Sequence, residues 1–411
     1  MNKKRLIVIG GGAAGFFCAV NAARLNPMLE VIIIEKTSKL LSKVKVSGGT
    51  RCNVTHSCFS IAEVVKKYPR GGNFLKKTFH YFFTSNTIAW FKERNVELKT
   101  EDDGRMFPVT DSSQTIIDCL LNEAKQYNVE IKTRTEIKSV KLEDEKFKVE
   151  LADSAFLHCD FICIASGGYA SLLQFEWLRK TGHSIVPPVP SLFTFNMPGN
   201  NITELMGVSV EKASVKIAGT KLSESGPLLI THWGLSGPAV LKSSAWGARE
   251  LEAMKYDFSI IINWLPDFNE QTLKDKFQQI RFDIASQKIV NRNPFSLPQR
   301  LWQYFLQQSG IDENIRWADL PAKEQNKLIK NLCAQEFRIK GKTTFKEEFV
   351  TAGGIALQDV DVNTMQSKIV QDLFFAGEVL DIDGITGGFN FQNAWTTGFI
   401  AASAIAERSK L

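Results

Sequence analysis

The chain has 411 residues, enough for two or three domains, and 44% of them are hydrophobic, as in an ordinary globular protein. Its formal net charge of +6 is modest, and basic residues alternate with acids, which argues against a protein built mainly to bind nucleic acid. Seven cysteines without a C-x-x-C pair favour a reducing cytoplasm, and the absence of an apolar run of about 18 residues argues against a membrane-spanning helix.

The N-terminal region carries the clearest pattern in the chain. An apolar β-branched run ends in Gly10-x-Gly12-x-x-Gly15, a small-residue helix follows, and a second apolar run ends in Glu35. Gly10 permits a sharp turn, Gly12 lets a pyrophosphate approach the backbone, and Gly15 lets the helix pack close to the strand. An acid about twenty residues after the last glycine can accept hydrogen bonds from a ribose. The pattern therefore predicts a dinucleotide-binding unit.

A secretory signal is the alternative for this region. Lys3, Lys4 and Arg5 precede the apolar run, and small residues follow near Ala22. Three consecutive glycines, the order of strand, turn and helix, and the acid at Glu35 argue against a signal. We therefore expect the region to fold as part of a domain.

A basic, glycine-containing loop comes next. Lys43 and Arg51 flank the segment Ser47–Thr50, whose backbone N–H groups could wrap phosphate oxygens. Together with Arg51, the polar residues Asn53 and Thr55 could reach a flavin ring or its ribityl chain. The alternative is a solvated basic loop, and the motifs later in the chain favour the functional interpretation.

The rest of this first region reads as α/β structure. Cys52 and Cys58 are separated by five residues, which is not the spacing of a disulfide reductase, so we expect two unpaired thiols. Ser112 or Ser113 can cap a helix that runs to about Tyr127. An antiparallel excursion follows, and a buried strand then leads into the small residues Ser166 and Gly167, where the chain can pass beneath a dinucleotide.

A change in composition marks a domain boundary at the proline cluster 187–190. Short alternating strands with glycine turns predict a small β-barrel or β-sandwich over 190–266, of which we take the barrel. His232, in the sequence THWGLSGP, could donate a proton to a flavin, although a structural histidine is the more common case. Amphipathic spacing predicts helices over 267–344.

The C-terminal region again shows a buried strand, a glycine turn and a small-residue helix, as the N-terminal region does. A buried strand ends at Gly377-Glu378, Asp381 follows, and Gly387-Gly388 precedes a small-residue helix from about Gln392. The positive N-terminal end of that helix could stabilise a reduced flavin at its N1–C2 edge. A terminal core helix is the alternative, but it does not explain the glycines and acids just before it.

Across its whole length, the chain resembles the FAD-dependent family that contains aminoacetone oxidase and the flavin reductases of 3-dehydro bile acids. The resemblance rests on the motifs GGGAAG, VSGGTRCNVT, THWGLSGP and AGEVLDIDGITGGFNFQNAWTTG. It implies an FAD-binding domain that is interrupted by an insert. Thr50 stands where the family usually has glycine, and His56 where asparagine is common. Members of the family act on unlike substrates, so the substrate stays open.

The fold class that we predict is therefore α/β, with a Rossmann-like, glutathione-reductase-like FAD-binding domain made of residues 1–189 and 345–411. A β-barrel (190–266) and a helical subdomain (267–344) form the insert. We expect no metal site, and the sequence identifies no catalytic acid or base. The motifs and the resemblance together assign cofactor contacts to Gly10, Gly12, Ala13, Ala14, Gly15, Glu35, Lys36, Lys43, Ser47, Gly48, Arg51, Cys52, Asn53, Thr55, Ile137, Ala165, Ser166, Gly167, Gly377, Glu378, Asp381, Gly387, Gly388, Phe389 and Asn390.

The predicted activity is that of a cytoplasmic flavoprotein oxidoreductase acting on a small organic molecule, either by reducing an activated C=C bond or by oxidising an amine. NAD(P)H would dock transiently as donor, because the sequence carries no second dinucleotide fingerprint. We expect neither a nucleic-acid partner nor a membrane. One alternative is a flavin-binding module without turnover. The other is a tRNA-modifying flavoprotein, whose basic face would have to come from Lys274, Lys276, Arg281, Lys288, Arg292 and Arg300.

Overall fold

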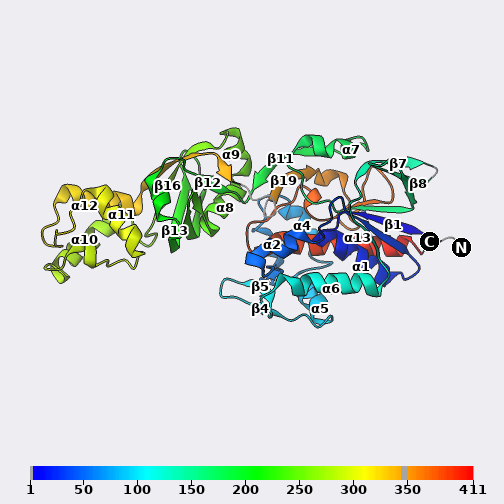
Figure 1. Ribbon diagram of the computed structural model, residues 1–411, viewed down its shortest axis with the longest axis horizontal. Coiled ribbons are helices and arrows are strands. Elements are labelled where there is room, and N and C mark those ends of the chain that lie inside the picture. Colours follow the sequence, from blue (N-terminus) through cyan, green and yellow to red (C-terminus); the bar gives the residue numbers. More distant parts are fainter. Residues whose placement is uncertain (1–2, 144, 344–349, 411) are drawn as a thin grey trace. The chain divides into compact units, whose positions relative to one another are not determined.

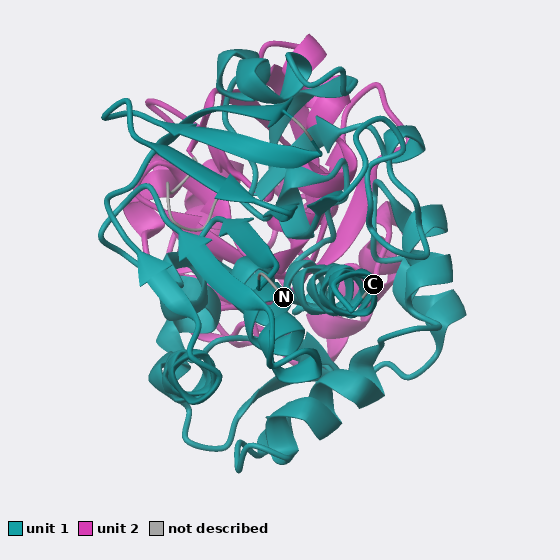
Figure 2. Ribbon diagram, turned by 90° about the vertical axis from the view of Figure 1, so that its right-hand side faces the viewer, with its two compact units in different colours: residues 1–191, 345–411 teal, residues 192–344 magenta. Residues whose placement is uncertain are grey.

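The computed structural model describes residues 3–143, 145–343 and 350–410. The chain divides into two compact units, of which unit 1 comprises residues 1–191 and 345–411 and unit 2 residues 192–344 (Figures 1 and 2). The predicted boundary between 344 and 345 lies outside the described residues.

A five-stranded parallel sheet forms the centre of unit 1, in the order β20-β10-β1-β2-β6. Its strands are β1 (Arg5–Ile9), β2 (Glu30–Ile34), β6 (Glu130–Lys132), β10 (Phe161–Ile164) and β20 (Leu373–Phe375). Ile9 pairs with both Ile34 and Ile164, and Ile164 pairs with Phe375, so the carboxyl ends of four strands meet at one edge. A parallel sheet is covered on both faces, which explains the near-continuous apolar runs. The predicted Rossmann-like α/β fold is confirmed.

Two helices that are distant in sequence pack closely in unit 1. Helix α13 (Phe389–Arg408) runs beside α1 (Ala13–Leu25) in Figure 1. A Cβ atom built on Gly398 of α13 would lie 2.9 Å from the carbonyl oxygen of Ala14, so the two backbones approach as closely as glycine allows. This contact brings the C-terminal region against the N-terminal glycine turn.

Smaller elements surround this core. The strands β7 (Ile137–Glu143), β8 (Lys146–Leu151) and β9 (Phe156–Cys159) form one antiparallel sheet, and β3 (Thr55–His56), β4 (Leu98–Thr100) and β5 (Arg105–Pro108) form another. The helices are α2 (Ser42–Thr50), α3 (Ile61–Val65), α4 (Gly72–Thr78), α5 (Thr84–Lys92), α6 (Ser113–Gln126) and α7 (Glu176–Arg179). The antiparallel pair β11 (Ile185–Ser191) and β19 (Val350–Ile355) flanks unit 2 in the chain.

Unit 2 is built on a seven-stranded antiparallel sheet in the order β17-β16-β13-β14-β15-β12-β18. Its strands are β12 (Thr194–Asn196), β13 (Ser209–Ile217), β14 (Ser223–Thr231), β15 (Gly234–Ser236), β16 (Asp257–Asn263), β17 (Gln335–Lys340) and β18 (Lys342–Thr343). Its helices are α8 (Pro238–Trp246), α9 (Ala248–Ala253), α10 (Glu270–Asp283), α11 (Gln299–Ser309) and α12 (Ala322–Cys333). The segment 267–344, predicted to be helical, thus also supplies β17 and β18, the two end strands of the sheet. Among the residues that the structure describes, no helix has the length and hydropathy needed to cross a membrane.

Candidate cofactor site

The turn between β1 and α1 gives its glycines two different tasks. A Cβ on Gly15 would overlap the carbonyl oxygen of Gly10, and one on Gly10 would lie 2.7 Å from the carbonyl carbon of Ala165, so both positions are needed for packing. A Cβ on Gly12 would meet no described atom within 4 Å. Gly12 is also the N-cap of α1, which begins at Ala13, and no described side chain caps the first N–H groups of the helix. Free N–H groups that face open space suit an anionic ligand.

Glu35 holds its carboxylate at this turn, at the end of β2. One oxygen accepts from the Gly11 N–H at 2.9 Å, and the other accepts from the N–H and hydroxyl of Thr37 at 2.8 and 2.9 Å. A carboxylate has about four lone-pair sites, so it can still accept from a ribose hydroxyl. The neighbouring Lys36 is largely exposed and pairs with Glu136 at 2.7 Å, next to Ile137 at the start of β7.

The segment after β10 and the start of β19 each carry a buried hydroxyl without a hydrogen bond to any described residue. The Ser166 hydroxyl is buried and interacts with the Tyr169 hydroxyl, but it makes no hydrogen bond within 3.5 Å to any described residue. Gly167 has φ +75° and faces open space, whereas Gly168 packs against Thr351. Thr351 itself is fully buried, and its hydroxyl likewise has no hydrogen bond to the described residues. Buried polar atoms without hydrogen bonds are rare in native proteins, so these two hydroxyls fit a polar ligand that lies against them.

The strand β20 leads into a second glycine turn beside α1. A Cβ on Gly377 would lie 2.7 Å from the Cβ of Ala14, and the Gly377 N–H donates to the Thr397 hydroxyl at 2.8 Å. Glu378 accepts from the N–H of Thr351 at 2.9 Å and pairs with Lys43 at 2.6 Å. The predicted residues Lys43 and Glu378 therefore meet although 335 positions separate them.

The N-terminus of α13 is held by the loop that follows α2. In the amide orientation that its neighbours require, Asn53 accepts from the Gly388 N–H at 2.9 Å and donates to the Thr55 carbonyl at 3.0 Å. The Thr55 hydroxyl donates to Gln392 at 2.6 Å. Asn390 makes two hydrogen bonds with the Gly384 backbone, at 2.8 and 2.9 Å. The side chains of Asn53, Thr55 and Asn390, which we predicted to contact the cofactor, thus make hydrogen bonds that fix the positive N-terminal end of α13.

Phe389 and Asp381 make further contacts near the N-terminus of α13. Phe389, the first residue of α13, stacks on His56 at 4.9 Å between ring centroids, and a Cβ on Gly387 would lie 2.7 Å from the Phe389 ring. Burial lowers the pKa of His56, whose Nε2 contacts the Asp103 carbonyl oxygen at 3.2 Å. The N–H of Asp381 donates to the Ile355 carbonyl at 3.0 Å, which ties the loop to β19.

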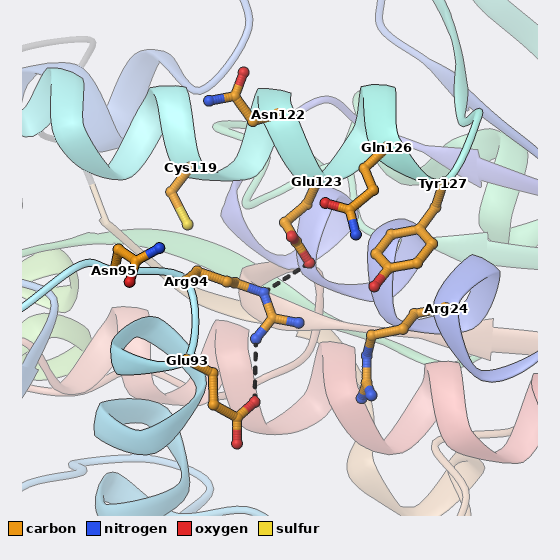
Figure 3. A pocket seen from close by; sticks show the side chains of 9 residues that line it. All are labelled: Arg24, Glu93, Arg94, Asn95, Cys119, Asn122, Glu123, Gln126 and Tyr127. Atoms are coloured by element: carbon orange, nitrogen blue, oxygen red, sulfur yellow. Dashed lines mark hydrogen bonds and ion pairs between the residues drawn. The ribbon is translucent and has the colours of Figure 1, made fainter.

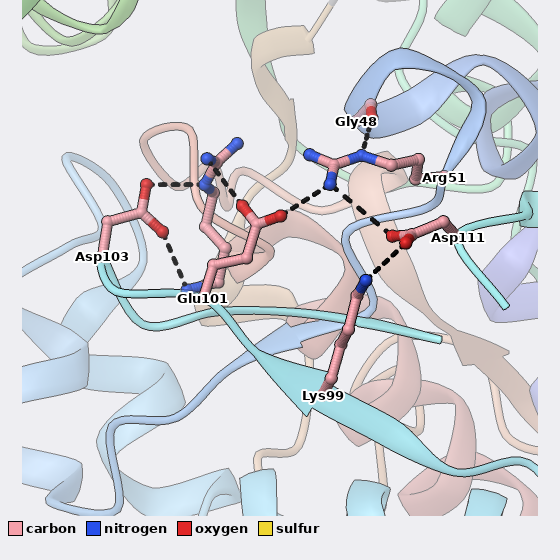
Figure 4. A network of polar contacts seen from close by, with 7 residues as sticks. Gly48, Arg51, Lys99, Glu101, Asp103 and Asp111 are labelled. Atoms are coloured by element: carbon pink, nitrogen blue, oxygen red, sulfur yellow. Dashed lines mark hydrogen bonds and ion pairs between the residues drawn. The ribbon is translucent and has the colours of Figure 1, made fainter. Parts of the chain in front are cut away.

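The loop that follows α2 places the guanidinium of Arg51 among acidic and aromatic side chains. Helix α2 is interrupted at Ser47–Gly49, and Gly48 has φ +58°. The guanidinium of Arg51 lies over the Phe107 ring at 4.1 Å. It also pairs with Glu101 at 2.6 Å (Figure 4). Asp111 lies 3.6 Å from the same guanidinium, so two carboxylates compensate its charge. Cys52 is completely buried, and burial raises the pKa of its thiol to about 12, which makes it an inert core group.

Sequence analysis missed a buried ionic cluster beside α13. Arg70 forms a two-pronged pair with the fully buried carboxylate of Asp383, which also accepts from the Ser191 hydroxyl at 2.8 Å. Burial raises the pKa of Asp383, and the Arg70 and Ser191 contacts oppose that shift. The Tyr68 hydroxyl donates to the Phe389 carbonyl at 2.7 Å. The aspartate stands in the C-terminal motif, but its partners lie far away in the sequence and carry no local signal.

A separate polar cavity of about 460 Å³ lies where α1, α5 and α6 end (Figure 3). Arg24, Glu123 and Tyr127 are among the residues that line it. Arg94 lies over the Trp90 ring at 3.7 Å and pairs with Glu123 at 2.6 Å. The cavity is at the C-terminal end of α1, and the 13 residues of that helix span about 20 Å, so it does not belong to the glycine turns. No metal-binding group of three or more His, Cys, Asp or Glu occurs within the described ranges.

The backbone turns, the Glu35 carboxylate and the α13 N-terminus thus surround the carboxyl edge of the parallel sheet, where α/β proteins bind ligands. His232, for which the sequence left open a proton-donor role or a structural one, is exposed in unit 2 and packs edge-to-face on Trp233 at 4.2 Å.

The whole chain matches one protein family. Residues 4–404 match the family described as HI0933-like protein Rossmann domain. The chain belongs to this family. Its relatives include the ribosomal RNA dihydrouridine synthase of Escherichia coli K12, 30% identical, with 98% of each chain covered. The 3-dehydro-bile acid delta(4,6)-reductase of Clostridium scindens is 26% identical over 98% of this chain and 99% of its own.

Solved structures share the fold of this HI0933-like chain at low sequence identity. The open conformation of a flavocytochrome c3 fumarate reductase superposes with a TM-score of 0.51 and 15% identity, over 99% of this chain and 78% of that one. We expected no nucleic-acid partner from the sequence. That expectation is not supported, because the relatives include proteins named as ribosomal RNA dihydrouridine synthases.

Proposed function

We propose that this chain is an FAD-dependent reductase that saturates a carbon–carbon double bond conjugated to a carbonyl group, and that its substrate is a uracil base in ribosomal RNA. The observation that carries the proposal is the end-to-end similarity, at 30% identity, to the ribosomal RNA dihydrouridine synthase of E. coli. Dihydrouridine is uridine with its C5–C6 double bond saturated. The name of the C. scindens relative describes the same chemical change in a bile acid. The tRNA-modifying alternative that the sequence raised therefore resembles this proposal, since both have RNA as the substrate of a flavoprotein.

Unit 1 is the FAD domain in this proposal, and its residues fit the cofactor. The open backbone at Gly12 and the free N–H groups of α1 would hold the pyrophosphate, and Glu35 the ribose of the adenosine half. The positive end of α13 at Gly388 would face the flavin. The buried hydroxyls of Ser166 and Thr351 would gain hydrogen bonds. When bound, FAD supplies hydride-transfer chemistry.

A reduced nicotinamide nucleotide is the electron donor that we propose. It supplies the hydride that reaches one carbon of the double bond, and a proton completes the other carbon, so two electrons are transferred for each base reduced. The sequence carries one strand–Gly-x-Gly-x-x-Gly–helix fingerprint, at Gly10 to Gly15, and FAD would occupy it. The donor would therefore dock transiently.

The test uses unmodified ribosomal RNA transcribed in vitro. The protein, reconstituted with FAD, is incubated anaerobically with NADH or NADPH and this RNA, and the digested nucleosides are analysed by mass spectrometry. We expect uridine to be converted to a product two mass units heavier, only when the reduced nucleotide is present.

A 3-oxo-4,6-diene steroid in a parallel reaction identifies the alternative substrate class. Reduction of the steroid with none of the RNA would replace RNA by a small enone as the substrate. Liquid chromatography of the flavin released on denaturation should show FAD; release of FMN, or of no flavin, would overturn the cofactor assignment as well.

A further inference from the structure

Helix α12 of unit 2 has one strongly buried face and one strongly basic face. Leu328, Ile329 and Leu332 belong to the apolar core of the unit. Lys323 and Lys327 are exposed on the other side of the helix, as is Lys330. Their spacing of i, i+4 and i+7 places the three ammonium groups in one row that covers about 10.5 Å along the helix axis.

The three lysines of this row are unpaired. Nowhere in the described ranges does the structure give the side-chain ammonium group of Lys323, Lys327 or Lys330 a hydrogen bond or an ion pair. Like charges four residues apart destabilise a helix by a few tenths of a kcal/mol. Glu324 lies three residues before Lys327, so the two side chains are neighbours on the helix surface, but the structure gives no ion pair between them. The three lysines therefore repel one another, and no ion pair within the described part of the chain offsets that repulsion.

The basic residues that the sequence suggested as an RNA-binding face behave differently. Arg281 donates to Gln325 and to the Ala318 carbonyl, and Arg300 donates to the carbonyls of Glu204 and Met206. Lys288 and Lys276 donate to Asn314 and Gln279. Of the six residues, Lys274 and Arg292 are exposed, and within the described ranges no side-chain partner is given for either. They lie on separate segments, whereas the lysines of α12 form one continuous row.

An exposed aromatic ring lies close to this helix. Phe282, near the end of α10, is 87% exposed. Its neighbour Arg281 contacts Gln325 in the first turns of α12 at 3.1 Å, which brings the two helices together there. Basic rows beside an exposed aromatic side chain suit nucleic acid, because cations contact phosphates and a ring can stack on an unpaired base.

We propose that the exposed face of α12, formed by Lys323, Lys327 and Lys330, docks the phosphate backbone of RNA, with the exposed Phe282 of the adjoining helix α10 as a further contact. The proposal rests on the proposed function, since it names the surface through which unit 2 would recognise the ribosomal RNA substrate. RNA is chosen over an acidic protein because the charge is a regular row, which matches a repeating line of phosphates, and because an exposed ring accompanies it.

The experiment replaces the row by Lys323→Gln, Lys327→Gln and Lys330→Gln in the full chain and measures binding to protein-free ribosomal RNA at several salt concentrations. Loss of three phosphate contacts should lower the slope of log Kobs against log[salt] by about 2, and weaken binding about tenfold or more at physiological salt. A matched control changes the exposed lysines Lys92, Lys125 and Lys180 of unit 1 to glutamine and should leave both quantities unchanged. The triple arginine variant of α12 should retain binding.

The outcomes separate this surface from the proposed function. If wild-type protein produces dihydrouridine while the glutamine variant keeps its affinity and salt slope, α12 is not the docking surface, although the function stands. If the variant loses RNA binding but wild type produces no dihydrouridine, the docking surface stands and the function fails. Failure of wild type to bind ribosomal RNA overturns the docking proposal outright, and an acidic protein partner would then be the occupant to test.

Discussion

Substitution by alanine at Gly15 should mainly lower the stability of the apoprotein, whereas at Gly12 it should mainly lower the affinity for FAD. In Gly15→Ala, the added methyl would overlap the carbonyl oxygen of Gly10, so α1 must shift, at a cost of about 1–3 kcal/mol in the free energy of unfolding of the apoprotein. In Gly12→Ala, the methyl meets no described atom within 4 Å, and φ −95°, ψ −170° suits alanine. Apoprotein stability should then change by about 0.5 kcal/mol, since alanine is a poorer N-cap than glycine.

The affinity for FAD should show the converse for Gly12→Ala. Its methyl occupies the space through which a pyrophosphate would reach the N–H groups of α1, so we expect the dissociation constant to rise at least tenfold, or about 1.4 kcal/mol. Thermal unfolding of the FAD-free protein and calorimetric titration with FAD measure the two effects. Wild-type affinity in Gly12→Ala would refute the placement of the pyrophosphate, and apoprotein unfolding as severe as in Gly15→Ala would refute the assignment of free space.

Three further predictions concern buried or titrating groups. All seven cysteines lie in the described residues and only Cys58 is partly exposed, so DTNB should label one thiol in the native protein and seven after denaturation; fast labelling that persists in Cys58→Ser would contradict this. Burial lowers the pKa of His56 from 6.5, so the folded state binds fewer protons than the unfolded state and stability falls as the pH drops through 6.5 toward the lowered value. Melting curves of His56→Gln from pH 7.5 to 5 should show a smaller loss than wild type, and equal losses would exclude His56 as the source. Asp383→Asn leaves the Arg70 guanidinium without its carboxylate and should cost about 3–5 kcal/mol in denaturant unfolding, whereas a cost below about 1 kcal/mol would show that the pair is not a structural tie.

Local signals predicted the sheet and its first helix well. The apolar run before Gly10 is strand β1, the small-residue segment is α1, and Glu35 follows β2 directly. Ser112 caps α6 as predicted, by accepting from the Gln114 N–H. These features depend on neighbours within a few residues, where turn chemistry, capping and apolar periodicity act, so the sequence alone contains the information.

Contacts between distant loops could not be predicted in this way. Arg70 and Asp383 are 313 residues apart, and nothing next to Arg70 in the sequence distinguishes it from a solvated arginine. The sequence suggests that Arg51 can reach a flavin ring or its ribityl chain, and it does not indicate that in the fold its guanidinium also meets Glu101 and Asp111 from the β4–β5 region. Each of these partners is chosen by tertiary structure, which brings charges together that no sequence window contains.

The makeup of the candidate site explains why relatives with this fold can carry names for unlike substrates. The groups that would hold the cofactor are mostly backbone N–H groups at Gly12 and the helix ends, together with one carboxylate, Glu35. Backbone groups recognise phosphate and the flavin, not the substrate, so the same cradle can serve a base or a steroid. Selectivity must then come from side chains outside the cradle. Under the function that we propose, the unpaired cations of α12 would be such side chains, and their row on unit 2 would favour an RNA substrate over a small enone more directly than any residue around the cofactor site.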